Sequence, residues 1–199
     1  MATLLESAKM RFDNKSRRSY EYRDQAGGVL ASVEQIVGGK PRSRLGRMFA
    51  TERDDSFVFL RFLDSNRETL FSIERAPVET AVAGYMGVVP ILRMPDGAIC
   101  GKVMANHQRV KDNMMGKTIA QYRWQLLNAD DVVLCDFEEK VVGKGRATFS
   151  VGKYQYLNSY RTPIASFDGD WIEFEREVPD DLRMLVIASP VAIDLLDGA

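Results

Sequence analysis

The chain has 199 residues, which is long enough for one domain with a substantial core, and 45% of them are hydrophobic. Its 27 lysine and arginine residues nearly balance its 28 aspartate and glutamate residues, so the overall charge does not favour a dedicated nucleic-acid-binding protein. The charges are unevenly placed: residues 9–47 carry ten cations and four anions, whereas residues 167–199 carry nine carboxylates and two arginines. This asymmetry predicts a polarised surface, unless the fold interleaves the two ends of the chain.

The chain begins with MATLLESAKMRF, which lacks the long apolar region of a secretory signal. Cys100 and Cys135 lie far apart in apolar surroundings, which favours two reduced thiols over a disulfide. We therefore expect a cytoplasmic protein. We interpret residues 1–16 as a flexible N-terminal segment of a single domain that spans residues 1–199.

Short alternating segments, rich in β-branched and aromatic residues and bounded by Asp, Asn, Gly or Pro, follow one another along the chain. They predict about a dozen antiparallel strands. The clearest of these segments are residues 57–63, 69–75, 88–94, 98–104, 122–127 and 170–176. The longest candidates for irregular connections, residues 38–46 and 77–87, are too short and too apolar to be domain linkers.

Four segments have the same organisation: an apolar strand, a turn centred on Asp or Asn, and a second apolar strand. They are YEYRDQAGGVLASV, FLRFLDSNRETLFSI, ILRMPDGAICGKV and WQLLNADDVVLCDF, with turns at Asp24, Asp64, Asp96 and Asn128. Asp and Asn favour turns because their side chains accept hydrogen bonds from the backbone two residues further on. The chain is therefore predicted to consist of repeated hairpins.

The segment RMLVIASPVAIDLL, residues 183–196, differs from everything before it. Ten uncharged residues separate Arg183 from Asp194, and a membrane-spanning helix needs about 20, so we expect no transmembrane segment. Pro179, Asp180 and Asp181 suit the first turn of a helix. The residues that follow are apolar on every side, which indicates a helix wrapped by protein over residues 179–196. Pro190 predicts a kink or a break near Ser189.

These features together resemble the tubby C-terminal-like superfamily, in particular its phospholipid-scramblase and LURP-one-related branch. The resemblance lies in the repeated hairpin units, best seen in RMPDGAICGKV, in the strand ending in arginine at SIERAP, and in the terminal PDDLRMLVIASPVAIDLL. It implies a mainly β fold, a closed twelve-stranded antiparallel barrel around a hydrophobic C-terminal helix. It also implies phosphoinositide or other lipid binding, although the acylated cysteine cluster of scramblases is absent.

Catalytic and metal sites have weak support in the sequence. His107 is the single histidine, so a histidine-based triad or metal centre is not expected. The pairs Glu138–Glu139 and Asp130–Asp131 are interpreted as solvated turn charges, since neighbours on a strand point to opposite faces. The segment ASFDGDWIEFE lacks the spacing of a calcium-binding EF-hand loop. We therefore expect neither an enzyme nor a cofactor.

The stretch GGKPRSRLGRMF is the best candidate for a binding site. Lys40, Arg42, Arg44 and Arg47 occur there without an intervening acid and beside three glycines. In an extended segment Arg42 and Arg44 face the same side and could hold an anionic group. The alternative is a solvated basic hairpin that keeps an edge soluble. Four cations contribute about 4 kcal/mol at an anionic membrane, which is only millimolar binding, so additional contacts would be needed.

The leading hypothesis is a non-enzymatic, cytoplasmic module, peripheral at the membrane, that binds an anionic phospholipid head group or a phosphoinositide. One alternative is an interaction or scaffold module that binds a protein partner and no small ligand. Another is a scramblase-like, calcium-linked lipid protein or an enzyme with an acidic site. The ligand, the process and the oligomeric state do not follow from the sequence.

Overall fold

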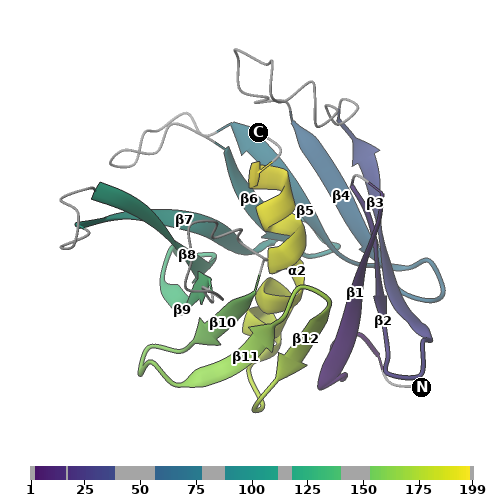
Figure 1. Cartoon of the computed structure of the whole chain (residues 1–199). Coiled ribbons are helices and arrows are strands. Elements are labelled where there is room, and N and C mark those ends of the chain that lie inside the picture. Colours follow the sequence, from purple (N-terminus) through teal and green to yellow (C-terminus); the bar gives the residue numbers. More distant parts are fainter. Residues whose placement is uncertain are drawn as a thin grey trace.

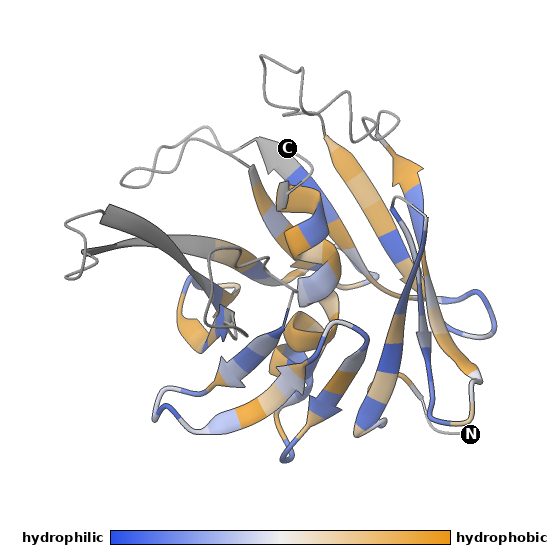
Figure 2. Ribbon diagram, viewed as in Figure 1, coloured by the Kyte–Doolittle hydropathy of each residue, from blue (hydrophilic) through white to orange (hydrophobic). Residues whose placement is uncertain are grey.

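The computed structural model of the chain describes residues 3–16, 18–38, 57–77, 88–111, 118–139 and 153–197. In these residues twelve antiparallel strands form a closed barrel, and a helix near the C-terminus runs through its middle (Figure 1). The predicted fold class, a mainly β, closed twelve-stranded barrel around a hydrophobic C-terminal helix, is confirmed. Hydrophobic and hydrophilic residues alternate along many of the strands (Figure 2).

The strands are β1 (Lys9–Ser16), β2 (Ser19–Arg23), β3 (Val29–Val37), β4 (Val58–Leu63), β5 (Thr69–Pro77), β6 (Val88–Arg93), β7 (Ile99–Lys111), β8 (Thr118–Asn128), β9 (Val133–Glu139), β10 (Tyr154–Leu157), β11 (Pro163–Phe167) and β12 (Trp171–Phe174). The helix is α2 (Asp180–Asp197). Strands were correctly predicted at all six of the clearest segments, although β7 and β8 are longer than predicted. The helix begins one residue later than predicted.

The sequence analysis assigned residues 1–16 to a flexible N-terminal segment, but residues 9–16 are part of the barrel. They form β1, which pairs with β2 on one side and β12 on the other. Leu4 is buried in the core, and the carbonyl oxygen of Ala8 accepts a hydrogen bond from the backbone of Phe174. The alternation in β1 was too weak to detect because Met10 is the one fully buried side chain of this strand.

Each strand pairs with its neighbours in the sequence, and β1 pairs with β12 to close the barrel. This closure places the basic N-terminal region beside the acidic C-terminal region. Lys9 Nζ lies 2.8 Å from a carboxylate oxygen of Glu173. The charge asymmetry between the two ends of the sequence is therefore partly interleaved around the barrel.

Five hairpin turns share one backbone conformation. In each turn the N–H of the first residue donates to the carbonyl oxygen of the fifth, and the N–H of the fourth donates to the carbonyl oxygen of the first. The fourth residue has a positive φ angle in every case. The first residues of the five turns are Asp24, Asp64, Met94, Asn128 and Asn158.

The predicted turns at Asp24, Asp64 and Asn128 are confirmed, with the side chain of each accepting backbone hydrogen bonds. In the third unit Met94 takes the first place, and Asp96 instead accepts a hydrogen bond from the N–H of Ala98 at 2.9 Å. The sequence analysis missed the turn at Asn158, between β10 and β11, although YQYLNSYRTPIASF has the same pattern.

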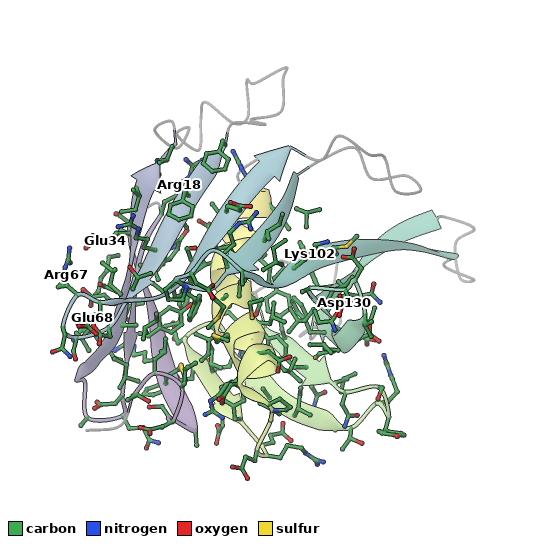
Figure 3. All side chains as sticks on the ribbon, turned by 180° about the vertical axis from the view of Figure 1, so that it is seen from behind. Arg18, Glu34, Arg67, Glu68, Lys102 and Asp130 are labelled. Atoms are coloured by element: carbon green, nitrogen blue, oxygen red, sulfur yellow. The ribbon has the colours of Figure 1, made fainter. Side chains whose placement is uncertain are left out.

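Charged residues at the fourth turn position tie one hairpin to the next. Arg67 pairs with Glu34 of β3 at 2.6 Å, and the two side chains point toward each other outside the barrel (Figure 3). Asp131 pairs with Lys102 of β7 at 2.6 Å, and Arg161 pairs with Glu138 of β9 at 2.8 Å. These exposed pairs contribute little stability individually, but they set the position of each turn against its neighbour.

The helix is buried on all sides, as the sequence predicted: residues 182–193 are all buried. Pro190 does not break it, because α2 is continuous from Asp180 to Asp197. Proline has no N–H to offer the carbonyl oxygen four residues earlier, that of Val186. The hydroxyl of Ser189 donates to this oxygen at 2.8 Å, and the hydroxyl of Tyr156 lies 2.6 Å from that of Ser189. Ser189 thus satisfies the carbonyl group that the proline leaves unpaired, and Tyr156 of the barrel wall is in turn hydrogen-bonded to Ser189.

The five turns all lie at one end of the barrel, which we call the turn end, because each joins an even-numbered strand to the next odd-numbered one. The helix begins at this end, where the carbonyl oxygen of Asp181 lies 3.9 Å from Sγ of Cys100 at the start of β7. It finishes at the opposite end, which we call the far end, close to the end of β5.

Candidate functional site

The predicted anion-binding residues Lys40, Arg42, Arg44 and Arg47 lie outside the described residues. The strands that precede and follow this stretch in the sequence are described. The strand β3 ends at Val37 and β4 begins at Val58, and both of these positions are at the far end of the barrel. The described residues next to this stretch in the sequence therefore lie at the far end.

Three apolar side chains are exposed at the far end, where β3 ends and β4 begins. Ile36, Val37 and Phe57 are 45%, 48% and 42% exposed. A Cβ atom on Gly38 would lie 3.0 Å from the backbone oxygen of Phe57, so the ends of the two strands are in contact. We call Ile36, Val37 and Phe57 the far-end patch. The sequence analysis missed it, but one signal was present: adjacent apolar residues such as Ile36 and Val37 cannot both face a core from one strand.

Two arginines lie buried at the same end. Arg75, at 0% exposure, donates from Nη1 to the carbonyl oxygen of Leu195 at 2.9 Å. This contact satisfies one of the carbonyl groups that a helix leaves unpaired at its C-terminus, and the positive charge suits the negative end of the helix dipole. Arg18 is buried in the turn between β1 and β2, and its Nη1 donates to Gln35 at 3.4 Å. Both guanidinium groups thus form hydrogen bonds within the folded barrel.

The hydroxyl of Tyr20 donates to Asp194 at 2.5 Å near the end of the helix. Burial and the neighbouring carboxylate both raise the pKa of Tyr20 far above its usual value, so the phenol stays protonated. This hydrogen bond satisfies a carboxylate on the last turns of an otherwise apolar helix. It is therefore a structural contact between β2 and α2 and not an acid–base pair.

The two ends of the barrel differ in charge. At the turn end, carboxylates outnumber cations among the described residues. The carboxylates are Asp24, Asp64, Glu68, Asp96, Asp130, Asp131, Glu175, Glu177, Asp180 and Asp181, and the cations are Arg67, Arg161 and Arg176 together with Arg23, Arg93 and Lys102, which contact the turns from the adjoining strands. The strands that finish at the far end are joined by sequences that include residues 39–56 and 140–152, which together contain eight cations and three carboxylates. The short β11–β12 connection, with Asp168 and Asp170, is an exception. The described turn end is thus acidic, whereas these two stretches of the sequence are basic.

The cysteines are unsuited to nucleophilic chemistry. Both are free thiols. Burial raises the pKa of Cys135 to about 12, and it also raises the pKa of the half-buried Cys100, where the charge of Asp181 acts in the same direction. Because the thiolate is the nucleophile, both residues stay in their inert protonated form at neutral pH.

The acidic candidates serve structural roles in the described residues. Oδ1 of Asp168 accepts hydrogen bonds from the N–H groups of Asp170 and Trp171, which closes the turn between β11 and β12. Glu138 pairs with Arg161. Within the described part of the chain, no group of three or more His, Cys, Asp or Glu residues is placed to hold a metal ion. His107 lies on β7, and its side chain is outside what the structure describes.

No family model, no curated protein and no solved structure matches this chain. The barrel with a central helix is the fold that the resemblance to tubby and scramblase domains implied, but membership of that superfamily stays a prediction. Among the described helical residues, none forms a helix long and apolar enough to span a bilayer.

Proposed function

We propose that this chain is a non-catalytic module that binds an anionic membrane surface through the far end of the barrel. The observation that carries the proposal is the far-end patch, which exposes Ile36, Val37 and Phe57 on the two strands that flank the basic stretch of Lys40, Arg42, Arg44 and Arg47. Peripheral membrane binding combines insertion of apolar side chains with attraction of cations to acidic head groups.

The apolar contacts supply what the cations lack. Four cations contribute about 4 kcal/mol, which corresponds to millimolar affinity. Complete burial of a large apolar side chain contributes about 1.5–3 kcal/mol, so three half-exposed side chains add about 2–4 kcal/mol. The sum of about 6–8 kcal/mol corresponds to binding in the micromolar range.

The axial charge distribution supports the same orientation. An anionic surface repels the acidic turn end and attracts the basic connections at the far end. The barrel would therefore approach the membrane with the end of α2 and the far-end patch facing the lipid. The closed barrel and its buried helix would stay intact, because no strand or helix has to open for this contact.

The test measures binding to vesicles of phosphatidylcholine with and without phosphatidylserine, at low and high salt. Wild-type protein should bind the acidic vesicles and ignore the neutral ones, and binding should fade as salt shortens the Debye length. Replacing Arg42 and Arg44 together with Ala should remove about 2 kcal/mol, roughly thirtyfold in affinity. Addition of a phosphoinositide to the vesicles distinguishes a specific head group from charge alone.

Separate variants test the contribution of the exposed apolar side chains to membrane binding. Phe57→Ser and Ile36→Ser should each weaken binding, and the loss should persist at high salt because it is not electrostatic. Val29→Ser is the matched control, since Val29 is similarly exposed but lies at the turn end. Equal binding by the wild type and all variants, or no binding to acidic vesicles, would reject membrane binding.

A further inference from the structure

A second exposed apolar surface lies at the turn end, on the hairpins β6–β7, β8–β9 and β10–β11. It consists of Ile99, Val132, Val133 and Tyr160, which we call the Tyr160 face. Tyr160 is 86% exposed and Val132 is 55% exposed. A tyrosine so far out of the fold contributes almost nothing to the core, and tyrosine is among the residues enriched in protein interfaces.

The strand registers place these four residues on adjacent hairpins. Leu157 of β10 pairs with Asp136 of β9, so the turn that follows Leu157 runs alongside the start of β9, where Val132 and Val133 lie. On the other side, Gly101 pairs with Asn128, which brings the preceding residues of β7 beside the β8–β9 turn. The ion pair between Lys102 and Asp131 holds this turn against β7. Figure 3 labels Lys102 and also Asp130, which precedes Asp131 in the turn.

The charge around the Tyr160 face is negative. Lys102 and Arg161 are both engaged with carboxylates, at 2.6 Å and 2.8 Å. Arg93, the cross-strand partner of Ile99, is likewise paired with Glu74 at 2.6 Å. Among the described residues no cation forms an ion pair with Asp96 or Asp130, which stand on the exposed turns beside Ile99 and Val132. The surface therefore combines apolar contact area with carboxylates that have no internal counter-charge.

We propose that the Tyr160 face binds a polypeptide segment in which arginine or lysine alternates with apolar residues. An arginine of such a segment can stack on the ring of Tyr160 and pair with Asp130, while its apolar neighbours pack on Val132 and Val133. An acidic membrane surface does not fit this face, because it would meet carboxylates. The proposal is independent of membrane binding at the far end, since the two surfaces are at opposite ends of the barrel.

The experiment uses the full chain and three labelled synthetic peptides, with binding followed by fluorescence anisotropy. One peptide alternates arginine with leucine, the second has glutamate in place of arginine, and the third has glycine in place of leucine. The first should bind in a salt-sensitive manner and the second should not bind. The third should bind more weakly than the first, because it offers charge without apolar contact.

Variants locate the binding. Tyr160→Ser and Asp130→Lys should each weaken binding of the arginine–leucine peptide by about tenfold or more, as expected for a central contact. Val29→Ser, an exposed apolar residue of the turn end on β3, should leave it unchanged. All three positions are exposed, so thermal unfolding should confirm that the variants fold.

Three results would overturn the proposal. The first is no binding of the arginine–leucine peptide by the wild type, or equal binding by the wild type and Tyr160→Ser. The second is self-association of the wild type that Tyr160→Ser abolishes, which would make a second copy of the chain the occupant. The third is loss of binding to phosphatidylserine vesicles in Tyr160→Ser, which would make the face a membrane contact.

Discussion

The guanidinium group of Arg75, at the far end of β5, donates a hydrogen bond to the carbonyl oxygen of Leu195 in the last turns of α2, at 2.9 Å across 120 residues of sequence. The side chain is fully buried, so the helix end and the barrel wall are joined by a charged contact away from water. Hydrogen bonds to charged groups are about twice as strong as those between neutral groups.

Replacing Arg75 should therefore loosen the helix end. Arg75→Ala leaves a cavity and an unpaired carbonyl group, and it should lower the free energy of unfolding by about 3–5 kcal/mol. Arg75→Lys keeps the positive charge and should lower the free energy of unfolding by less. Urea unfolding followed by circular dichroism measures both. If Arg75→Ala is as stable as the wild type, the contact with Leu195 does not hold the helix in place.

The fit between β7 and the helix depends on Gly101. A Cβ atom at this position would lie 2.2 Å from the carbonyl oxygen of Leu127 and 3.0 Å from Cδ1 of Leu185. Gly101→Ala should therefore be strongly destabilising, because the first obstacle is backbone and cannot rotate away. Gly27→Ala is the control: nothing lies within 4 Å of its Cβ, and it should cost about 1 kcal/mol through its φ of +90°.

Leu185 is the helix residue that faces Gly101, and it is fully buried. Leu185→Ala should lower the free energy of unfolding by about 2–5 kcal/mol, and Leu185→Asp should abolish folding because it buries an unpaired carboxylate. Leu185→Ala should not rescue Gly101→Ala, since the clash with Leu127 remains. A chain truncated before Pro179 that still unfolds cooperatively as a monomer would contradict a structural role for the helix.

Ser189 compensates for Pro190, and a double-mutant cycle can measure this. Ser189→Ala leaves the carbonyl oxygen of Val186 and the hydroxyl of Tyr156 without their hydrogen bonds, and it should cost about 1–3 kcal/mol. In a Pro190→Ala background residue 190 regains an N–H for Val186, so the same change should cost less. Additive losses would show that Ser189 acts independently of the proline.

Alkaline pH should unfold the protein. Burial raises the pKa values of Tyr20, Tyr22 and Tyr156 far above the usual value of about 10 and raises the pKa of Cys135 to about 12. Above about pH 9–10 the unfolded chain releases these protons while the folded chain keeps them, so stability falls as pH rises. Phenolate absorbance should show some of the seven tyrosines ionising only together with loss of structure. Their complete ionisation in the folded protein would contradict this.

Local patterns in the sequence determined the elements of the fold. The alternation of residues 57–63 and 69–75 predicted β4 and β5, and Asp24, Asp64 and Asn128 predicted turns, because pleating and side-chain hydrogen bonds act over a few residues. The apolar stretch 183–196 predicted a wrapped helix, because a helix apolar on every side must be buried. The strand β1 was not predicted, because its mostly polar sequence shows little alternation of hydrophobic and polar residues.

Other features depend on contacts between residues that are far apart in the sequence, and only the tertiary structure shows them. The sequence does not indicate that Arg75 caps the end of α2, that Gly101 makes room for Leu185, or that β1 pairs with β12, since each relationship joins residues far apart in the chain. The two surfaces also depend on the fold. Ile36, Val37 and Phe57 come together because β3 and β4 pair, and the turn end is acidic because a meander closed into a barrel places every second connection at the same end.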